Sequence, residues 1–299
     1  MKLAFIGGGN MAAALMGGLQ RRGGAGSDML VIERDAARRA WLERELGVVT
    51  QASAEAALAG VDIVVLAVKP GDLREVCERL RAHAAAAAQA VADAPADAPA
   101  DAPAYAPPRA AGPLLLSIAA GIPSAAIVRW SGNDAVARAM PNTPALIGQG
   151  ITGLYARPAV SAAQRDAAAG VLRAIGDCVW FEDEGMLDAV TAISGSGPAY
   201  VFYFMEALQE AARRMGMDGA QARHFAVQTF VGAAQLAAQS SEEIALLRER
   251  VTSKGGTTAA ALASMGAAGV AAAIAAGAFA ALDRSREMAR TLGAGTPGA

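Results

Sequence analysis

Three observations predict an α/β fold in which a parallel-sheet domain precedes an all-α domain. The first half of the 299-residue chain alternates short apolar, β-branched runs with helical patterns, as parallel sheets covered by helices do. Strand signals stop after Glu184, and Ala-rich helical patterns continue almost to the end. The length also exceeds that of a usual single domain. We therefore predict two domains, at residues 1–183 and 184–299.

Five apolar runs predict the parallel strands, and two later runs flank a predicted helix at about residues 162–175. We expect these two to extend the same sheet. The seven predicted strands are residues 3–6, 29–32, 63–68, 114–118, 135–139, 151–155 and 178–181.

Residues 84–113 form a low-complexity insert in which Ala-Asp-Ala-Pro units recur. Recurrent prolines block a continuous helix, and so few large apolar side chains cannot offset the ordering entropy. We expect an excursion between a helix at about residues 72–83 and the strand that begins at Leu114. A tolerated insertion is one interpretation of this segment, and a docking function is the other.

Two long helices are predicted in the second half. Gly197 and Pro198 open the first, which runs to about Met215, because proline is favoured in a first turn. Asp218 and Gln221 have the spacing of a capping box for the second. Their apolar positions predict burial against another subunit, with an ordinary helical core as the alternative; these positions are Val201, Phe204, Met205, Leu208, Phe225, Val227, Phe230, Val231 and Leu236.

Composition limits the partners to small molecules and other subunits. Apolar stretches are broken before the roughly 20 residues that span a bilayer, and the first residues lack a signal-peptide pattern, so we expect a cytoplasmic protein without a membrane segment. A net charge of −2 with interspersed signs predicts no nucleic-acid surface. Cys77 and Cys178 lie far apart without metal-ligand spacing, so neither a disulfide framework nor a metal site is predicted.

A glycine-rich loop follows the first predicted strand and matches the dinucleotide-binding pattern G-x-G-x-x-G/A. Gly7 permits the tight turn, Gly9 lets the backbone approach a pyrophosphate, and Ala12 is small enough for close packing of helix and strand. This position predicts a Rossmann-type domain that binds NAD(H) or NADP(H). The residues predicted to contact the cofactor here are Gly7, Gly9, Asn10 and Met11.

Two adjacent residues at the end of the second strand argue in opposite directions about the cofactor. Glu33 stands where an acid commonly hydrogen-bonds the ribose 2′-OH of NAD, whereas Arg34 could meet the 2′-phosphate of NADP. The choice between NAD and NADP therefore stays open.

Two proline-containing loops follow other strands of the predicted sheet. Ligands of open α/β sheets bind at the carboxyl ends of the strands, so we expect both loops to border the cofactor. The predicted contacts are Ala67, Val68, Lys69 and Pro70 in the first loop, and Met140 and Asn142 in the second.

Two further Ser/Gly-rich segments, residues 194–200 and 253–258, each precede a helical pattern. Glycines at a helix start expose unpaired N–H groups to an anion, and hydroxyls add donors. Each segment is a candidate carboxylate cradle, with simple helix capping as the alternative.

Taken together, six motifs resemble pyrroline-5-carboxylate reductase, the last enzyme of proline synthesis. That family carries Gly-Asn-Met, Ala-Val-Lys-Pro, Ser-Ile-Ala-Ala-Gly, Arg-Ala-Met-Pro-Asn-Thr-Pro, Ser-Gly-Ser-Gly-Pro-Ala-Tyr and Ser-x-Gly-Gly-x-Thr in this order. All six occur here, at residues 9–11, 67–70, 117–121, 138–144, 194–200 and 253–258.

The resemblance implies hydride transfer from NAD(P)H to the C=N bond of 1-pyrroline-5-carboxylate, giving L-proline. It also implies a helical domain that dimerises by interlocking helices, often within a ring of dimers. By matching positions, Ser253, Gly256 and Thr257 hold the substrate carboxylate, and Thr258 hydrogen-bonds the ring nitrogen as the catalytic residue. The insert at residues 84–113, Lys254 in place of a frequent proline, and Glu33 depart from the family pattern, and Glu33 puts the usual preference for NADPH in doubt.

Two other functions compete with this one. A β-hydroxyacid dehydrogenase needs a base, commonly a lysine in a helix of the second domain, but the lysines here are Lys2, Lys69 and Lys254. Only Lys254, in the loop, could revive that function. A non-catalytic dinucleotide-binding regulator would leave the loop at residues 253–258 idle. Neither His83 nor His224 lies in a motif, so surface or packing roles are expected for both.

Overall fold

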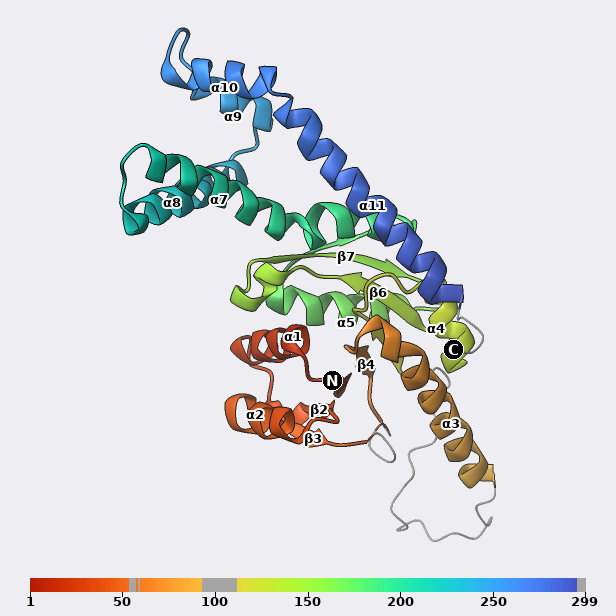
Figure 1. The fold of residues 1–299 in the computed structure, drawn as a ribbon. Helices are drawn as coiled ribbons and strands as arrows, with labels where there is room; N and C mark the ends of the chain where they lie inside the picture. Colours follow the sequence, from red (N-terminus) through yellow and green to blue (C-terminus); the bar gives the residue numbers. More distant parts are fainter. Residues whose placement is uncertain (54–57, 59, 93–111, 295–299) are drawn as a thin grey trace. The chain divides into compact units, whose positions relative to one another are not determined.

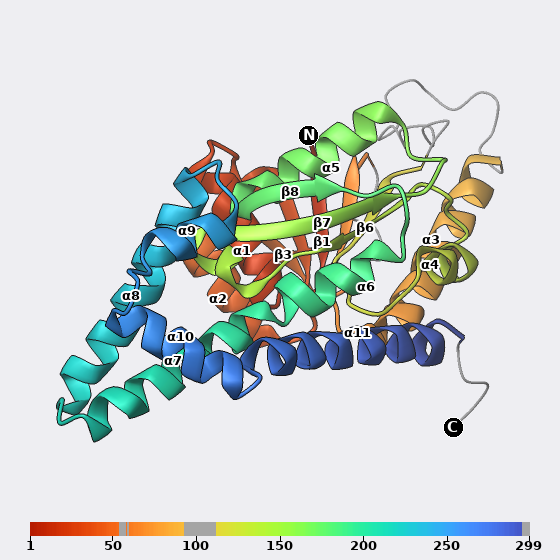
Figure 2. The same cartoon turned by 90° about the horizontal axis from the view of Figure 1, so that it is seen from above.

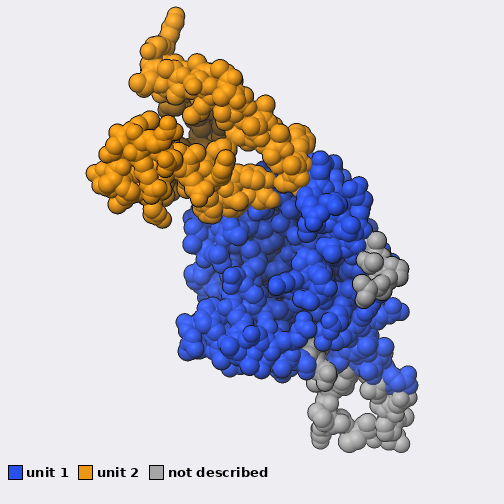
Figure 3. Space-filling view, in the orientation of Figure 1, with its two compact units in different colours: residues 1–195, 282–299 blue, residues 196–281 orange. Residues whose placement is uncertain are grey.

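The structure, a computed structural model, describes residues 1–53, 58, 60–92 and 112–294. The chain divides into two compact units, one of residues 1–195 with 282–299 and one of residues 196–281 (Figure 3). The first unit includes residues 184–195, which follow the predicted domain boundary at residues 183/184. That boundary stays a prediction.

The first unit is built on one eight-stranded sheet with the strand order β3-β2-β1-β4-β5-β6-β7-β8 (Figures 1 and 2). All neighbouring strands are parallel except β6 and β7. The strands are β1 (Leu3–Ile6), β2 (Met29–Ile32), β3 (Val49–Gln51), β4 (Ile63–Leu66), β5 (Leu114–Ser117), β6 (Val136–Met140), β7 (Gly150–Ala156) and β8 (Gly176–Trp180).

The predicted α/β fold and all seven predicted strands are confirmed, including the extension of the sheet by β7 and β8. Strand β3 was not predicted. It is only three residues long, carries polar residues at Thr50 and Gln51, and lies at the edge of the sheet beside β2. A strand this short has no periodicity that a sequence pattern could reveal.

Helices surround the sheet and make up the second unit. They are α1 (Asn10–Arg21), α2 (Ala36–Leu46), α3 (Leu73–Ala92), α4 (Ser124–Ser131), α5 (Ala162–Leu172), α6 (Met186–Val190), α7 (Gly197–Arg214), α8 (Gly219–Gln239), α9 (Ile244–Arg250), α10 (Thr257–Ala267) and α11 (Val270–Ala294).

Helix α3 corrects one expectation, because it continues to Ala92 instead of ending near His83. Residues 84–92 are rich in alanine, the strongest helix former, and the first proline of the insert is Pro95. Residues 84–92 are therefore helical, contrary to the predicted excursion. The rest of the insert, residues 93–111, lies outside the described residues, so its two interpretations stay open.

The core of the first unit lies on both faces of the sheet. Leu3 and Phe5 of β1 pack in one cluster with residues of α1, α2 and α5, while Ala4 and Ile6 pack in the other with residues of α3 and α4. Successive side chains of a strand point to opposite faces. Burial on both faces is why these strands are continuous apolar runs rather than alternating patterns.

The second unit buries few of its own apolar side chains. In α7, α8 and α10 the buried residues are Ala222 and Ala226, whereas Phe202, Tyr203 and Leu236 are exposed. The predicted capping box at the start of α8 is confirmed: the Asp218 carboxylate accepts a hydrogen bond from the Gln221 N–H at 2.8 Å. Exposed apolar surface of this kind marks a surface that another molecule covers.

Membrane-spanning potential is limited in the described part of the chain. No single helix there has the length and hydropathy of a bilayer span, and only the bent pair α10 and α11 reaches that standard jointly.

Candidate active site

A cavity of about 360 Å³ opens at the carboxyl ends of β1, β2 and β4. The chain passes from β1 to β2 on one side and returns to β4 on the other side of β1, so the strand order reverses here. Such a switch point is where open α/β sheets bind ligands. The walls come from the glycine loop, the residues that follow β2 and β4, and one face of α3.

The glycine loop has the geometry of a phosphate cradle. Gly7 has a φ of 97°, and a Cβ at this position would lie 2.6 Å from the Ala67 carbonyl oxygen, so only glycine fits. Gly9 precedes the first residue of α1 without a side-chain cap, and a Cβ there would meet open space. The first N–H groups of α1 are therefore accessible to an anion.

Glu33 and Arg34 both line this cavity. The Glu33 side chain accepts hydrogen bonds from the Gly8 N–H at 2.8 Å and from the Asp35 N–H at 3.0 Å. Arg34 is exposed, and its guanidinium lies 3.9 Å from the carboxylate of Asp72. The structure therefore joins Glu33 to the glycine loop itself.

Of the remaining predicted cofactor contacts, Ala67, Val68 and Lys69 line the cavity. Pro70 does not line it and begins a 3-10 turn, η2 (Pro70–Asp72). Asn10 and Met11 are not among the residues that line the cavity, and Met11 packs against the core. They form the first turn of α1, whose N–H groups have no partner within the helix.

Met140 and Asn142 lie apart from the cavity. Asn142 is buried, and its side-chain oxygen accepts a hydrogen bond from the Ile151 N–H at 3.0 Å, which ties this loop to β7. The Met140 methyl group lies 2.7 Å from where a Cβ on Gly195 would stand. Both side chains therefore have packing roles in the structure, and their predicted contact with the cofactor stays a prediction.

One face of α3 completes the cavity and was missed by the sequence analysis. Val76, Arg79, Leu80 and His83 line it. Their spacing of three, four and seven residues places them on a single helical face, so this periodicity was a usable signal. His83, for which a surface or packing role was expected, is half-buried in the cavity wall.

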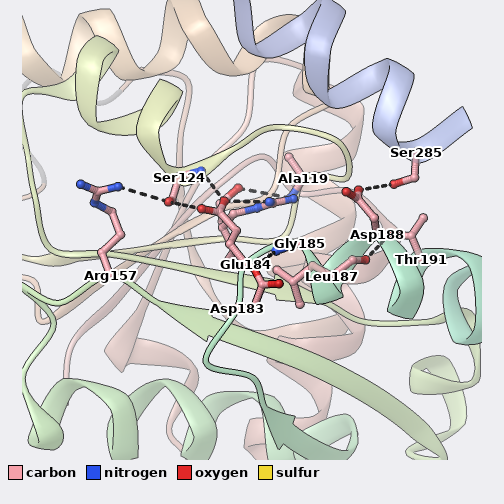
Figure 4. Close-up of polar contacts among 12 residues, drawn as sticks. Ala119, Ser124, Arg157, Asp183, Glu184, Gly185, Leu187, Asp188, Thr191 and Ser285 are labelled. Atoms are coloured by element: carbon pink, nitrogen blue, oxygen red, sulfur yellow. Dashed lines mark hydrogen bonds and ion pairs between the residues drawn. The ribbon is translucent and has the colours of Figure 1, made fainter. Parts of the chain in front are cut away.

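A polar cluster around Glu184 links the segment that follows β8 to β6 and α4 (Figure 4). The Glu184 carboxylate accepts hydrogen bonds from Arg138 at 2.8 Å and from the N–H and hydroxyl of Ser124, each at 2.6 Å. Nearby, the Ser285 hydroxyl of α11 donates to Asp188 of α6 at 2.6 Å. An arginine inside a buried strand needs a partner, so Arg138 could have been flagged from sequence, although Glu184 could not have been identified.

The loop before α10 presents an open helix start within the second unit. Gly256 precedes the first residue of α10 without a side-chain cap, and a Cβ on Gly256 would lie 2.4 Å from the Ser253 hydroxyl. Three hydroxyl side chains lie in this loop and in the first turn of α10, those of Ser253, Thr257 and Thr258. This arrangement of a free helix N-terminus and three hydroxyls suits a carboxylate.

The other Ser/Gly-rich segment is arranged differently. It begins in a π-helical turn, η5 (Thr191–Gly195), where the Ser194 hydroxyl donates back to the Val190 carbonyl at 3.1 Å. The Ser194 hydroxyl is therefore already hydrogen-bonded, and the segment leads directly into α7. Of the two candidate carboxylate cradles, the loop before α10 is favoured.

A Rossmann-type cavity at the strand switch point, together with a helical unit that has an uncapped helix start, is typical of a dinucleotide-dependent oxidoreductase. Comparisons with known proteins narrow this class. Residues 184–288 match the family model described as pyrroline-5-carboxylate reductase dimerisation. Residues 2–96 match the family model described as NADP oxidoreductase, coenzyme F420-dependent.

Relatives of full length agree with these matches. A pyrroline-5-carboxylate reductase of Pseudomonas aeruginosa is 42% identical over 98% of both chains, and that of Haemophilus influenzae is 38% identical over 87% of this chain and 88% of its own. Among solved structures, the Coxiella burnetii pyrroline-5-carboxylate reductase has a TM-score of 0.84 and 33% identity, covering 97% of this chain and 99% of its own. The chain belongs to the pyrroline-5-carboxylate reductase family, which confirms the family that the six motifs predicted.

Proposed function

We propose that this protein reduces the C=N bond of 1-pyrroline-5-carboxylate with NAD(P)H and releases L-proline. The observation that carries the proposal is the presence in one chain of the glycine-loop cavity and of the open helix start at α10. The first suits a dinucleotide and the second suits a small carboxylate. The relatives named above are pyrroline-5-carboxylate reductases, which supports the same reaction.

The cofactor residues act by position. Gly7 and Gly9 admit the pyrophosphate to the start of α1, where the N–H groups of Asn10 and Met11 are accessible, and Glu33 receives the adenine ribose. Ala67, Val68 and Lys69, which follow β4, also line the cavity. When bound, the reduced nicotinamide supplies the hydride.

The substrate residues lie in the loop before α10. Ser253, Gly256 and Thr257 hold the carboxylate through hydroxyls and helix-start N–H groups. The Thr258 hydroxyl hydrogen-bonds the ring nitrogen, because a hydroxyl can donate to an imine nitrogen and accept from a protonated one. A protonated C=N bond is already electrophilic, so orientation is the main task left to the protein.

A Thr258→Val variant tests this assignment. Valine keeps the shape but lacks the hydroxyl, and loss of one positioned donor costs about 10²-fold in kcat. Thr258→Ser restores the hydroxyl and is the matched control. Turnover is followed as NADH and NADPH oxidation with pyrroline-5-carboxylate, and cofactor affinity and melting temperature are measured alongside. Wild-type turnover in Thr258→Val, or equal losses in both variants, contradicts the role of the hydroxyl.

The competing functions predict different results in the same assay. A hydroxyacid dehydrogenase that used the exposed Lys254 as its base would oxidise a hydroxy acid and ignore the imine. A regulator would bind NAD(P)H without oxidising it when the imine is added.

The assembly we propose is a cytoplasmic homodimer or a larger ring of dimers. The chain carries a dimerisation domain, and the exposed apolar side chains of α7, α8 and α11, such as Phe202, Leu236 and Phe279, need a cover. A second copy of the same helices provides it. Light scattering on the purified protein measures the number of chains.

A further inference from the structure

We propose that this protein binds NADH in preference to NADPH and that Glu33 is the residue that sets the preference. The inference rests on the proposed dinucleotide binding in the glycine-loop cavity. It departs from the description of the family model that matches residues 2–96, which names NADP.

Glu33 is held in place before any cofactor arrives. One carboxylate oxygen accepts the Gly8 N–H at 2.8 Å, and the other accepts the Asp35 N–H at 3.0 Å. A carboxylate offers about four lone-pair sites, so each oxygen keeps capacity for one further donor. The 2′- and 3′-hydroxyls of the adenine ribose are two such donors, and Glu33 lines the cavity that receives them.

The 2′-phosphate of NADPH interacts unfavourably with the Glu33 carboxylate. It carries a charge of about −1.5 to −2 at neutral pH and offers mainly acceptors. It therefore cannot replace the hydroxyl donors that suit Glu33, and it adds repulsion between like charges. For NADPH to bind, Glu33 has to give up its two backbone hydrogen bonds or tolerate the phosphate beside it.

The neighbouring arginines Arg34, Arg38 and Arg39 do not offset this unfavourable interaction with the 2′-phosphate. Two of them, Arg38 and Arg39, donate hydrogen bonds to the backbone. The Arg38 Nε donates to the Gly8 carbonyl at 2.6 Å, and its guanidinium lies 4.2 Å above the Trp41 ring. The Arg39 guanidinium donates to the carbonyls of Glu33 and Arg34 at 2.8 and 2.9 Å.

The Arg38 Nη2 has no hydrogen-bond partner but is buried, whereas Arg34 is exposed, so Arg34 is the arginine of this group that can turn to a phosphate. Its contact with Asp72 at 3.9 Å is an exposed ion pair, which is weak. Two other cationic side chains line the cavity, but neither follows β2 as Glu33 does. Arg79, whose ion pair with Glu75 at 3.3 Å is also exposed, belongs to α3, and Lys69 follows β4. NADPH binding is thus reduced rather than abolished, and it depends on Arg34.

The test is binding of NADH and of NADPH to the full-length protein without substrate, followed by nicotinamide fluorescence. The wild type is expected to bind NADH more tightly by on the order of tenfold, the effect of one charged hydrogen bond. Glu33→Gln, which keeps the size and removes the charge, should weaken NADH and strengthen NADPH, so the ratio of dissociation constants moves toward one. Arg34→Gln should weaken NADPH alone.

Glu45→Gln, at an exposed carboxylate on α2, is the matched control and should leave both affinities unchanged. Equal or tighter NADPH binding by the wild type overturns the inference, as does an unchanged ratio in Glu33→Gln. Arg34→Gln keeps the test decisive if Glu33→Gln loses its fold, because unchanged NADPH binding in Arg34→Gln also contradicts the argument. This binding test contains no imine, so it is independent of turnover. Failure to turn over pyrroline-5-carboxylate with either dinucleotide, measured in the separate activity assay, would contradict the proposed function and not the binding preference.

Discussion

Removing the Glu184 carboxylate is expected to destabilise the first unit strongly. Its side chain is 25% exposed and that of Arg138 only 10%, and the two form an ion pair at 2.8 Å. The same carboxylate accepts from the N–H and the hydroxyl of Ser124, the first residue of α4, which has no side-chain cap of its own. Glu184 therefore neutralises a buried arginine and caps a helix 60 residues earlier in the chain.

The size of the effect follows from these contacts. Leaving one charge of a buried pair without its partner costs about 3–5 kcal/mol. The partial exposure of Glu184 favours the lower end, so we expect Glu184→Ala to lower the free energy of unfolding by about 3 kcal/mol. For a unit of this size, that corresponds to a fall in melting temperature of about 6–12 °C.

Urea and thermal unfolding of Glu184→Ala measure this loss, and Glu182→Ala is the control in the same segment. Glu182 is 90% exposed and pairs with Arg165 at 3.4 Å, so its removal should cost less than about 1 kcal/mol. In a double-mutant cycle, Arg138→Met combined with Glu184→Leu should be less destabilising than the two single changes added together. Equal effects of Glu184→Ala and Glu182→Ala, or simple additivity in the cycle, would refute this reasoning.

Two further predictions concern stability. Gly18→Ala should destabilise the protein by about 1–3 kcal/mol, because the added Cβ would lie 2.3 Å from the Ala174 carbonyl oxygen. Gly17→Ala should stabilise α1 by up to about 1 kcal/mol, because the nearest atom to its added Cβ is 3.5 Å away. Urea unfolding measures both changes, and effects of the same sign would contradict the packing of α1. Burial raises the pKa of the Cys77 thiol to about 12, with Glu78 adding to the effect. The unfolded thiol loses its proton above its ordinary pKa of 9.0 while the folded one keeps it, so stability should fall as pH rises from 9 toward 12. Between pH 8 and 10 the wild type should lose about 1 kcal/mol more than Cys77→Ala, and parallel pH profiles of the two proteins would show that the thiol stays at its ordinary pKa.

Much of the fold was accessible from sequence because its signals are local. The apolar runs that became β1, β2, β4 and β5 are buried on both faces, and each run alone indicates a strand. The glycine loop was recognisable because its positive φ at Gly7 and its uncapped helix start restrict the residues that fit. Prediction failed for the short edge strand β3, where the local signal was weak, and for the alanine-rich end of α3, where the helix propensity of alanine was outweighed in the interpretation by the prolines that follow.

The sequence by itself thus determined the fold class, the dinucleotide loop and the order of the family's motifs, since each depends on residues that are neighbours along the chain. Only the tertiary structure decided that Glu33 bonds to the Gly8 N–H, that one face of α3 completes the cavity, and that Glu184 pairs with Arg138. These contacts join residues 25 or more positions apart, and the Glu184 pair joins residues 46 positions apart. No local periodicity encodes such a pairing, because it exists only once the strands and helices have packed and a buried charge or donor has to find the partner that packing brings within reach.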